Sequence, residues 1–268
     1  MRLPILLASV LLLAACGQSG KKPLILATTT STQDTGLLDA LVPAFEKDSG
    51  YKVKVVAVGT GEALRMGERG DADVLLVHAP ALEEQFMVQG FGGERAPVMH
   101  NDFVLLGPAA DPAGVKGSSA ADALRKIEAA KAPFVSRADR SGTHKKELDL
   151  WSAAKVKPSG AWYIEAGQGM GECLQIAGEK VAYILADRGT YLVMRGRLAL
   201  DVLVEGDKAL LNPYHVITVS PKKHPEVNSD GARSFLEFIT GARAQQLIRD
   251  FGKEQCGQPL FVPDAAAR

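Results

Sequence analysis

Residue types suited to holding an anion gather in four short segments, each rich in glycine, serine or threonine. The segments are residues 28–31, 59–61, 141–143 and 167–171, and Arg137 stands just ahead of the third. Each comes where an apolar run gives way to a helical pattern. A helix N-terminus exposes unpaired backbone N–H groups and a positive dipole end, which suit anions. The candidate ligand-binding residues are Thr29, Thr30, Ser31, Thr60, Arg137, Ser141, Gly142, Thr143, Gly169 and Gly171.

Uncharged donors and one guanidinium can surround a small dianion, because the guanidinium adds a fork of charge-assisted hydrogen bonds. The plainer alternative is that these hydroxyls are ordinary helix N-caps. An enzyme would need a nucleophile within reach of a base, and the sequence has no Gly-x-Ser-x-Gly order. We therefore expect a binding protein, not an enzyme, with no cofactor and no metal; an anion-sensing domain for a signalling partner is the other alternative.

The N-terminus indicates export. Arg2 is the only charge before Lys21, and residues 3–15 are apolar apart from Ser9, which fits the apolar region of a signal peptide. The small residues ahead of Cys16 resemble the lipobox of bacterial lipoproteins, in which the cysteine carries the lipid. We expect a signal peptide over residues 1–15 and a lipid anchor at Cys16 with a polar tether over 16–23; an ordinary signal peptide is the alternative.

Charge and composition limit the classes of partner that the protein can bind. Lys and Arg together number 31, as do Asp and Glu, so no basic excess indicates nucleic acid. No second long apolar run predicts a membrane span, and the membrane is expected to be met through the lipid anchor alone. Any anion site must be built locally. Besides Cys16 the sequence has Cys173 and Cys256, which could pair in an oxidising compartment, and their spacing is unlike a metal site.

Strand and helix patterns alternate along the chain, which indicates an α/β fold with largely parallel sheets. A turn signal at residues 205–208 between two short apolar runs predicts a β-hairpin. In open α/β sheets ligands bind beyond the carboxyl ends of the strands. The predicted strands are 24–28, 53–58, 74–77, 134–136, 161–165, 181–185, 202–204, 209–211 and 216–219. A helix is predicted through Leu37, Leu38, Leu41, Val42 and Phe45, capped at Asp34 or Thr35 and ended by Gly50, and the other predicted helices are 81–89, 123–130, 145–154, 171–177, 187–195, 231–239 and 242–251.

The segment from Arg137 to Thr143 resembles the Arg-x-x-x-Ser-Gly-Thr loop of periplasmic phosphate-binding proteins. The resemblance to the tungstate-binding proteins of the same superfamily is closer and runs from about residue 24 to residue 264. Two departures stand in the loop, since that family often has glycine where Ala138 stands and an acidic residue at Arg140. The segments that carry the resemblance are 28–32, 34–38, 58–64, 71–80, 101–108, 136–144, 187–192 and 212–214.

The resemblance implies a two-lobe periplasmic binding protein of type II, with hinged lobes and the anion in the cleft between them. Lobe one would comprise residues 24–99 and 216–268, and lobe two residues 100–215, with crossings near 100–103 and 211–215. It also implies a monomeric lipoprotein in the periplasm or on the extracytoplasmic membrane surface, which captures tungstate for an ABC permease and its ATPase. Molybdate, sulfate or phosphate are the alternative ligands.

His78 bears on which anion is preferred. Phosphate-binding relatives have an aspartate near this point that accepts the proton of hydrogen phosphate, and here the matching run from Asp73 to Pro80 has His78 instead. A site of hydroxyls, backbone N–H groups and Arg137 would offer donors only, which favours a fully ionised oxyanion. A structural histidine remote from the ligand is the alternative for His78. We do not expect cysteines at positions 173 and 256 in the tungstate-binding branch, so a Cys173–Cys256 disulfide is a further hypothesis.

Overall fold

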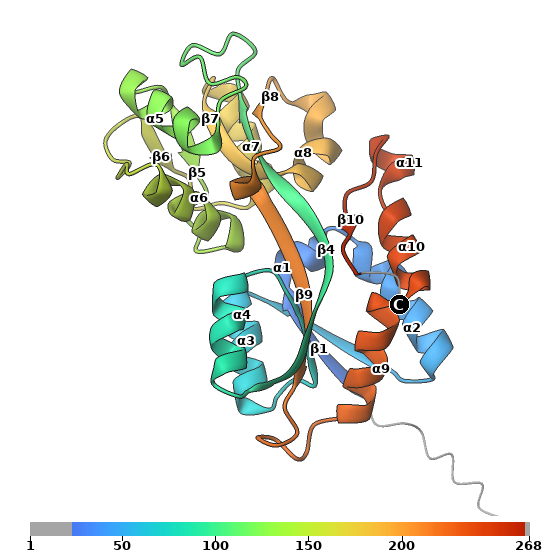
Figure 1. Ribbon diagram of the computed structural model, residues 1–268. Helices are drawn as coiled ribbons and strands as arrows, with labels where there is room; N and C mark the ends of the chain where they lie inside the picture. Colours follow the sequence, from blue (N-terminus) through green and yellow to red (C-terminus); the bar gives the residue numbers. More distant parts are fainter. Residues whose placement is uncertain (1–22, 266–268) are drawn as a thin grey trace, which may run out of the picture.

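The computed structural model describes residues 23–265, so the predicted signal peptide and Cys16 lie outside the described residues. Figure 1 shows two groups of elements joined by long strands. The strands are β1 (Leu24–Thr29), β2 (Val53–Val58), β3 (Val74–Val77), β4 (Gly92–Gly107), β5 (Phe134–Ser136), β6 (Tyr163–Glu165), β7 (Tyr183–Asp187), β8 (Asp201–Val204), β9 (Leu211–Val219) and β10 (Val262–Pro263). The helices are α1 (Thr30–Asp34), α2 (Leu37–Ser49), α3 (Thr60–Arg69), α4 (Pro80–Val88), α5 (Ala120–Ala130), α6 (Gly142–Ala153), α7 (Met170–Glu179), α8 (Arg188–Met194), α9 (Ser229–Thr240), α10 (Ala242–Asp250) and α11 (Lys253–Cys256), with 3-10 turns at Arg195–Arg197 and Lys208–Leu210.

The strands follow one path in the order β2-β1-β3-β9-β4-β7-β5-β6, with β8 and β10 both paired to β4. Strands β4 and β9 cross between the two groups (Figure 1) and pair antiparallel as far as Asp102 and Leu211. From Phe103 onward β4 pairs with β7 instead. We name the group around β1–β3 lobe one and the group around β5–β8 lobe two. The chain is therefore a two-lobe α/β protein.

Each lobe has its own apolar core on both faces of its strands. In lobe one all four residues of β3 are buried, as expected of a central strand covered by helices on both sides. Lobe two is centred on Phe134, Trp151 and Tyr183. The lobes are linked through β4 and β9, through α11, which contacts α8, and through Leu192 of α8, which belongs to the lobe-one core. No helix in residues 23–265 is long and apolar enough to cross a bilayer.

Three sequence predictions are wrong. The sheet is mixed, since only β1–β2, β1–β3, β5–β6 and β5–β7 are parallel. The hairpin around residues 205–208 does not form: β8 pairs with β4, and a 3-10 turn leads the chain into the crossing strand β9. Cys173 and Cys256 are both free and buried, because one lies in a core of lobe two and the other in a core of lobe one.

Candidate functional site

On the lobe-one side, β1 ends at Thr29 and α1 begins at the next residue. Thr29 is buried, and its hydroxyl caps α1 by accepting a hydrogen bond from the backbone N–H of Thr32 at 3.2 Å. The same oxygen lies 3.0 Å from Ser31 Oγ. Thr30 and Ser31 are exposed in the first turn. This junction is therefore an N-cap, as the plainer alternative held, and it also presents hydroxyls to solvent.

His78 follows β3 and belongs to the same cluster. Its Nε2 lies 3.1 Å from Thr29 Oγ1 and 3.3 Å from Ser31 Oγ, and its Nδ1 lies 2.9 Å from Asn212 Oδ1. Desolvation lowers the pKa of His78, and the bond to Asn212 and the Glu83 and Asp187 carboxylates only partly oppose it. The ring is neutral at neutral pH and contacts two candidate ligand residues, so it is not remote from the candidate site.

On the lobe-two side, β5 ends at Ser136 and a five-residue loop leads into α6. Two non-glycine residues of this loop, Ala138 and Arg140, adopt left-handed backbone conformations with φ of 50° and 62°. Ser141 then caps α6 by accepting from the backbone N–H of His144 at 3.3 Å. Left-handed backbone is costly for residues with a Cβ, so glycine would fit position 138 with less strain than alanine.

Arg137 and Asp139 are the charged pair of this loop. The carboxylate accepts from Arg137 Nη2 and, at 3.0 Å, from the backbone N–H of Ser141. Burial raises the pKa of the Asp139 carboxyl, but the bonds from Ser141 and the Arg137 guanidinium outweigh it and leave the pKa below its usual range. Asp139 is therefore ionised and holds one edge of the guanidinium in place.

The other part of the Arg137 guanidinium is unsatisfied. Its side chain is only 15 % exposed, and Nε is buried with no hydrogen-bond partner. A buried donor on a charged group is costly to leave unpaired, and such groups in native proteins usually have an acceptor. Arg137 therefore has an unpaired donor in the loop that the sequence identified as anion-binding.

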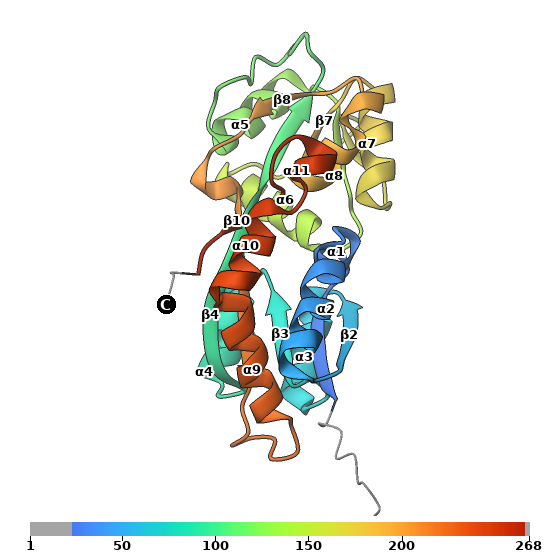
Figure 2. The same ribbon diagram turned by 90° about the vertical axis from the view of Figure 1, so that its right-hand side faces the viewer.

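The first and third junctions face each other across the lobes. A Cβ placed on Gly142 would lie 3.1 Å from His78 Cε1, so only glycine allows this approach without displacing the ring. Figure 2 shows α1 at the top of lobe one, directly beneath lobe two. Thr143 is buried in the first turn of α6. The structure thus brings Thr29, Ser31 and Gly142 together around His78.

The remaining candidate residues are placed as follows. Gly169 caps α7, Gly171 lies in its first turn, and Arg137 acts electrostatically on Cys173 one turn further on. The α7 N-terminus therefore lies near Arg137. Thr60 opens α3 behind Gly59 and is half-buried, and within residues 23–265 it makes no hydrogen bond to the others. Thr60 stands apart from the contacts that join the other candidates.

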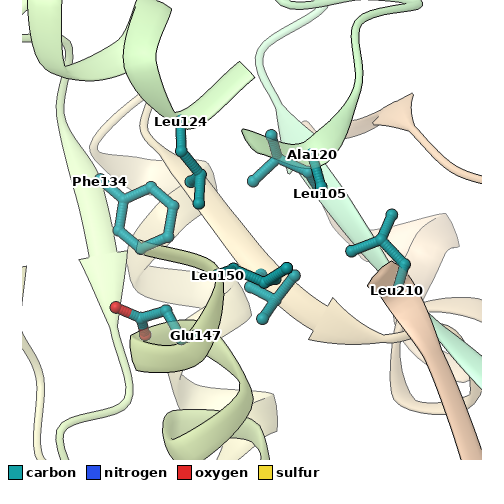
Figure 3. Close-up of a pocket in the computed structure, with 8 residues that line it drawn as sticks. Leu105, Ala120, Leu124, Phe134, Glu147, Leu150 and Leu210 are labelled. Atoms are coloured by element: carbon teal, nitrogen blue, oxygen red, sulfur yellow. The ribbon is translucent and has the colours of Figure 1, made fainter. Parts of the chain in front are cut away.

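Sequence reasoning missed three contributors: Asp139, Asn212 and Tyr214. Asn212 and Tyr214 stand in a segment that carried the resemblance, but only the strand pairing places them beside His78. His78 and Asp139 add groups that can accept hydrogen bonds beside the predicted donors. An apolar cavity of about 10 Å³ next to Glu147 (Figure 3) is too small for an anion and lacks donors that could hold one. No cluster of metal-ligating side chains occurs in the described part of the chain.

Comparison with known proteins agrees with this architecture. Residues 16–243 match the PBP superfamily domain. A curated tungstate-binding protein, TupA of Peptoclostridium acidaminophilum, is 54% identical over 249 residues, which cover 92% of this chain and 87% of the relative. The chain belongs to the TupA family of the PBP superfamily. The family resemblance and the two-lobe fold inferred from the sequence are therefore confirmed.

Solved members of the TupA family share the fold at high identity. The tungstate-binding TupA of Desulfovibrio alaskensis G20 superposes with a TM-score of 0.83 at 49% identity, covering 91% of this chain and 100% of that one. The tungstate ABC transporter structure from Geobacter sulfurreducens gives 0.75 at 50% identity, covering 87% and 100%. These relatives span nearly the whole described chain, so both lobes belong to the family's common fold.

Proposed function

We propose that this protein captures tungstate outside the cytoplasm and delivers it to an ABC permease and its ATPase. The observation that carries the proposal is the buried, unpartnered Nε of Arg137 in a loop that faces the His78 cluster of the opposite lobe. The names of the TupA relatives support tungstate as the ion. Thr29, Ser31, Arg137, Ser141, Gly142, Thr143 and the α7 N-terminus with Gly169 and Gly171 would hold it, and Thr30 and Thr60 would line the approach.

The geometry favours binding over catalysis. Arg137 and the helix N-termini can neutralise an oxyanion. The hinge would lie where β4 exchanges its partner β9 for β7, with lobe one formed by residues 24–99 and 216–268 and lobe two by residues 100–215. Closure of the lobes would bring both sets of donors onto one ion. No cofactor is needed for this function.

Titration calorimetry of the chain without residues 1–20 tests the proposal with sodium tungstate as the probe. We expect one ion bound per monomer, and no release of product from phosphate or sulfate esters. An absence of tungstate binding would refute the ligand, and turnover of esters would refute the binding-only role.

The predicted lipid anchor at Cys16 has its own test. The full-length protein should fractionate with membranes in a detergent-extractable form, and Cys16→Ser should shift it to the soluble extracytoplasmic fraction. An unchanged distribution in Cys16→Ser would refute lipidation at this residue.

A further inference from the structure

A run of hydrogen bonds leads from the lobe-one hydroxyls to the two crossing strands. His78 Nδ1 lies 2.9 Å from Asn212 Oδ1, and Asn212 Nδ2 donates to Asn101 Oδ1 at 2.8 Å and to the Tyr214 hydroxyl oxygen at 3.2 Å. The Asn212 amide nitrogen therefore faces two acceptors, and its oxygen must face His78. Because an amide oxygen can only accept, His78 Nδ1 must carry the hydrogen.

This tautomer decides the role of the other ring nitrogen. A neutral imidazole with its hydrogen on Nδ1 has a bare lone pair on Nε2. That lone pair faces Thr29 Oγ1 and Ser31 Oγ at 3.1 and 3.3 Å. Thr29 Oγ1 accepts from the Thr32 backbone N–H and also lies 2.7 Å from Thr32 Oγ1 and 3.0 Å from Ser31 Oγ, so the ring nitrogen is one of three acceptors within reach of its hydrogen. His78 therefore acts as an acceptor that orients hydroxyl groups at the candidate site.

The ring is itself held from several sides. It stacks on Tyr214 with ring centroids 4.6 Å apart. The Glu83 and Asp187 carboxylates are the charged groups that act on it, one from α4 and the other from the end of β7. Both favour a positive charge on the ring, and desolvation opposes it more strongly. His78 is thus a fixed neutral acceptor rather than a mobile surface histidine.

The far end of the hydrogen-bond run lies at the crossing between lobes. Asn101 on β4 and Asn212 on β9 are register partners, two residues before β4 pairs with β7 of lobe two. Both asparagines are buried. The Asn212 amide that holds His78 therefore lies next to the point about which the lobes would rotate.

We propose that His78 is a positioning residue that sets the direction of the Thr29 and Ser31 hydroxyls and couples them, through Asn212, to the crossing strands. The inference rests on the proposed function, because the hydroxyls are oriented for an oxyanion. An incoming oxyanion would compete with Nε2 for the hydroxyl hydrogens, so its affinity depends on what occupies the Nε2 position.

Two substitutions separate this role from simple packing. In His78→Asn the amide nitrogen takes the place of Nδ1 and keeps the bond to Asn212, whereas His78→Gln reaches the Nε2 position and can place an acceptor there. We expect His78→Asn to bind tungstate about threefold to tenfold more tightly than His78→Gln, the range of one hydrogen bond, because the hydroxyl hydrogens then have no competing acceptor at the Nε2 position. Equal affinities, or weaker binding by His78→Asn, would overturn the proposal.

A measurement on the unmodified protein avoids any variant that fails to fold. Long-range ¹H–¹⁵N correlation NMR reports the tautomer of each histidine ring without ligand. We expect His78 in the Nδ1–H form and His144 in the opposite form, because His144 Nδ1 accepts from the Arg140 backbone N–H at 3.0 Å. An Nε2–H tautomer at His78 would overturn the proposal even if tungstate binds, and failure of the wild-type protein to bind tungstate would instead refute the proposed function.

Discussion

The lobe-one and lobe-two sides of the candidate site differ in charge and in backbone strain. On the lobe-one side, Thr29 and His78 are uncharged, and their hydrogen bonds lead to the crossing strands. On the lobe-two side, Arg137 and Asp139 are charged, and Ala138 stands in a left-handed conformation. The comparison indicates that lobe two supplies charge through a strained loop and lobe one supplies oriented hydroxyls.

The largest effect is expected at Arg137. Arg137→Ala should weaken tungstate binding by about 2–4 kcal/mol, the cost of losing a desolvated charge-assisted contact. Arg137→Lys should also lose affinity, because one ammonium cannot reproduce the planar fork. Calorimetry measures both. Exposed Arg140 in the same loop provides the matched control, and an equal loss in Arg140→Ala would mean that general positive charge, not this contact, drives binding.

The second prediction concerns Glu147, which lies beneath the lobe-two loop. Burial raises the pKa of Glu147 to about 7. Hydrogen bonds with Tyr163, Ser136, Trp151 and the Arg137 backbone lower the pKa but do not offset the burial. Between pH 4.5 and pH 7 the folded state therefore keeps the Glu147 proton, whereas the unfolded state, with the ordinary pKa of 4.5, loses it. The contribution of Glu147 to the free energy of unfolding is complete below pH 4.5 and is lost as the pH rises toward 7. The loss should total ~3 kcal/mol.

Denaturant unfolding between about pH 4.5 and pH 7 measures this dependence. Glu147→Gln should remove that part of the slope. Glu165, which is exposed, provides the control, since Glu165→Gln should leave the slope unchanged. An unchanged slope in Glu147→Gln would place the titrating group elsewhere.

A third, smaller effect is expected on the lobe-one side. Thr29→Val removes the N-cap hydroxyl of α1 and should lower the free energy of unfolding by about 1 kcal/mol. Ser31→Ala should cost less than about 0.5 kcal/mol because Ser31 is exposed. Thermal unfolding compares the two. If Ser31→Ala were the more destabilising, the assignment of Thr29 as the structural hydroxyl would be wrong.

The smallest effect tests the strain in the lobe-two loop. Ala138→Gly should raise the free energy of unfolding by about 0.5–1 kcal/mol, since glycine accepts a φ of 50° without a Cβ penalty. Ala153→Gly, in the last turn of α6, is the counterpart and should destabilise by up to about 1 kcal/mol. Destabilisation by both would show that the loop is unstrained.

The local elements were predictable from the sequence, and the contacts between distant segments were not. The strand over 74–77 matches β3, and the helix ended by Gly50 matches α2, because their apolar spacing depends only on local burial. The cap of α2 is Gly36 and not the predicted Asp34 or Thr35. Residues 201–204 pair with β4, which is nearly a hundred residues earlier in the sequence. The turn signal at residues 205–208 is local and therefore predicted pairing with residues 209–211 instead.

The candidate site shows the same limit. Hydroxyl-rich junctions and Arg137 were found because helix N-termini have a local signature. The acceptor groups were not found from the sequence, because Asn212 meets His78 only through the pairing of β9 with β3. The unpaired Nε of Arg137 likewise has no sequence signature, because burial and partners are properties of the fold.

Competitive calorimetry with tungstate, molybdate, sulfate and phosphate at one pH and salt concentration tests the central claim most directly. Arg137 and the oriented hydroxyls should favour a large, fully ionised oxyanion, while hydrogen phosphate would bury an O–H group beside Nε2 and Asp139 at the expense of their existing bonds. We predict that tungstate and molybdate bind far more tightly than sulfate, and that sulfate binds no more weakly than phosphate. Phosphate binding as tightly as tungstate would contradict the account.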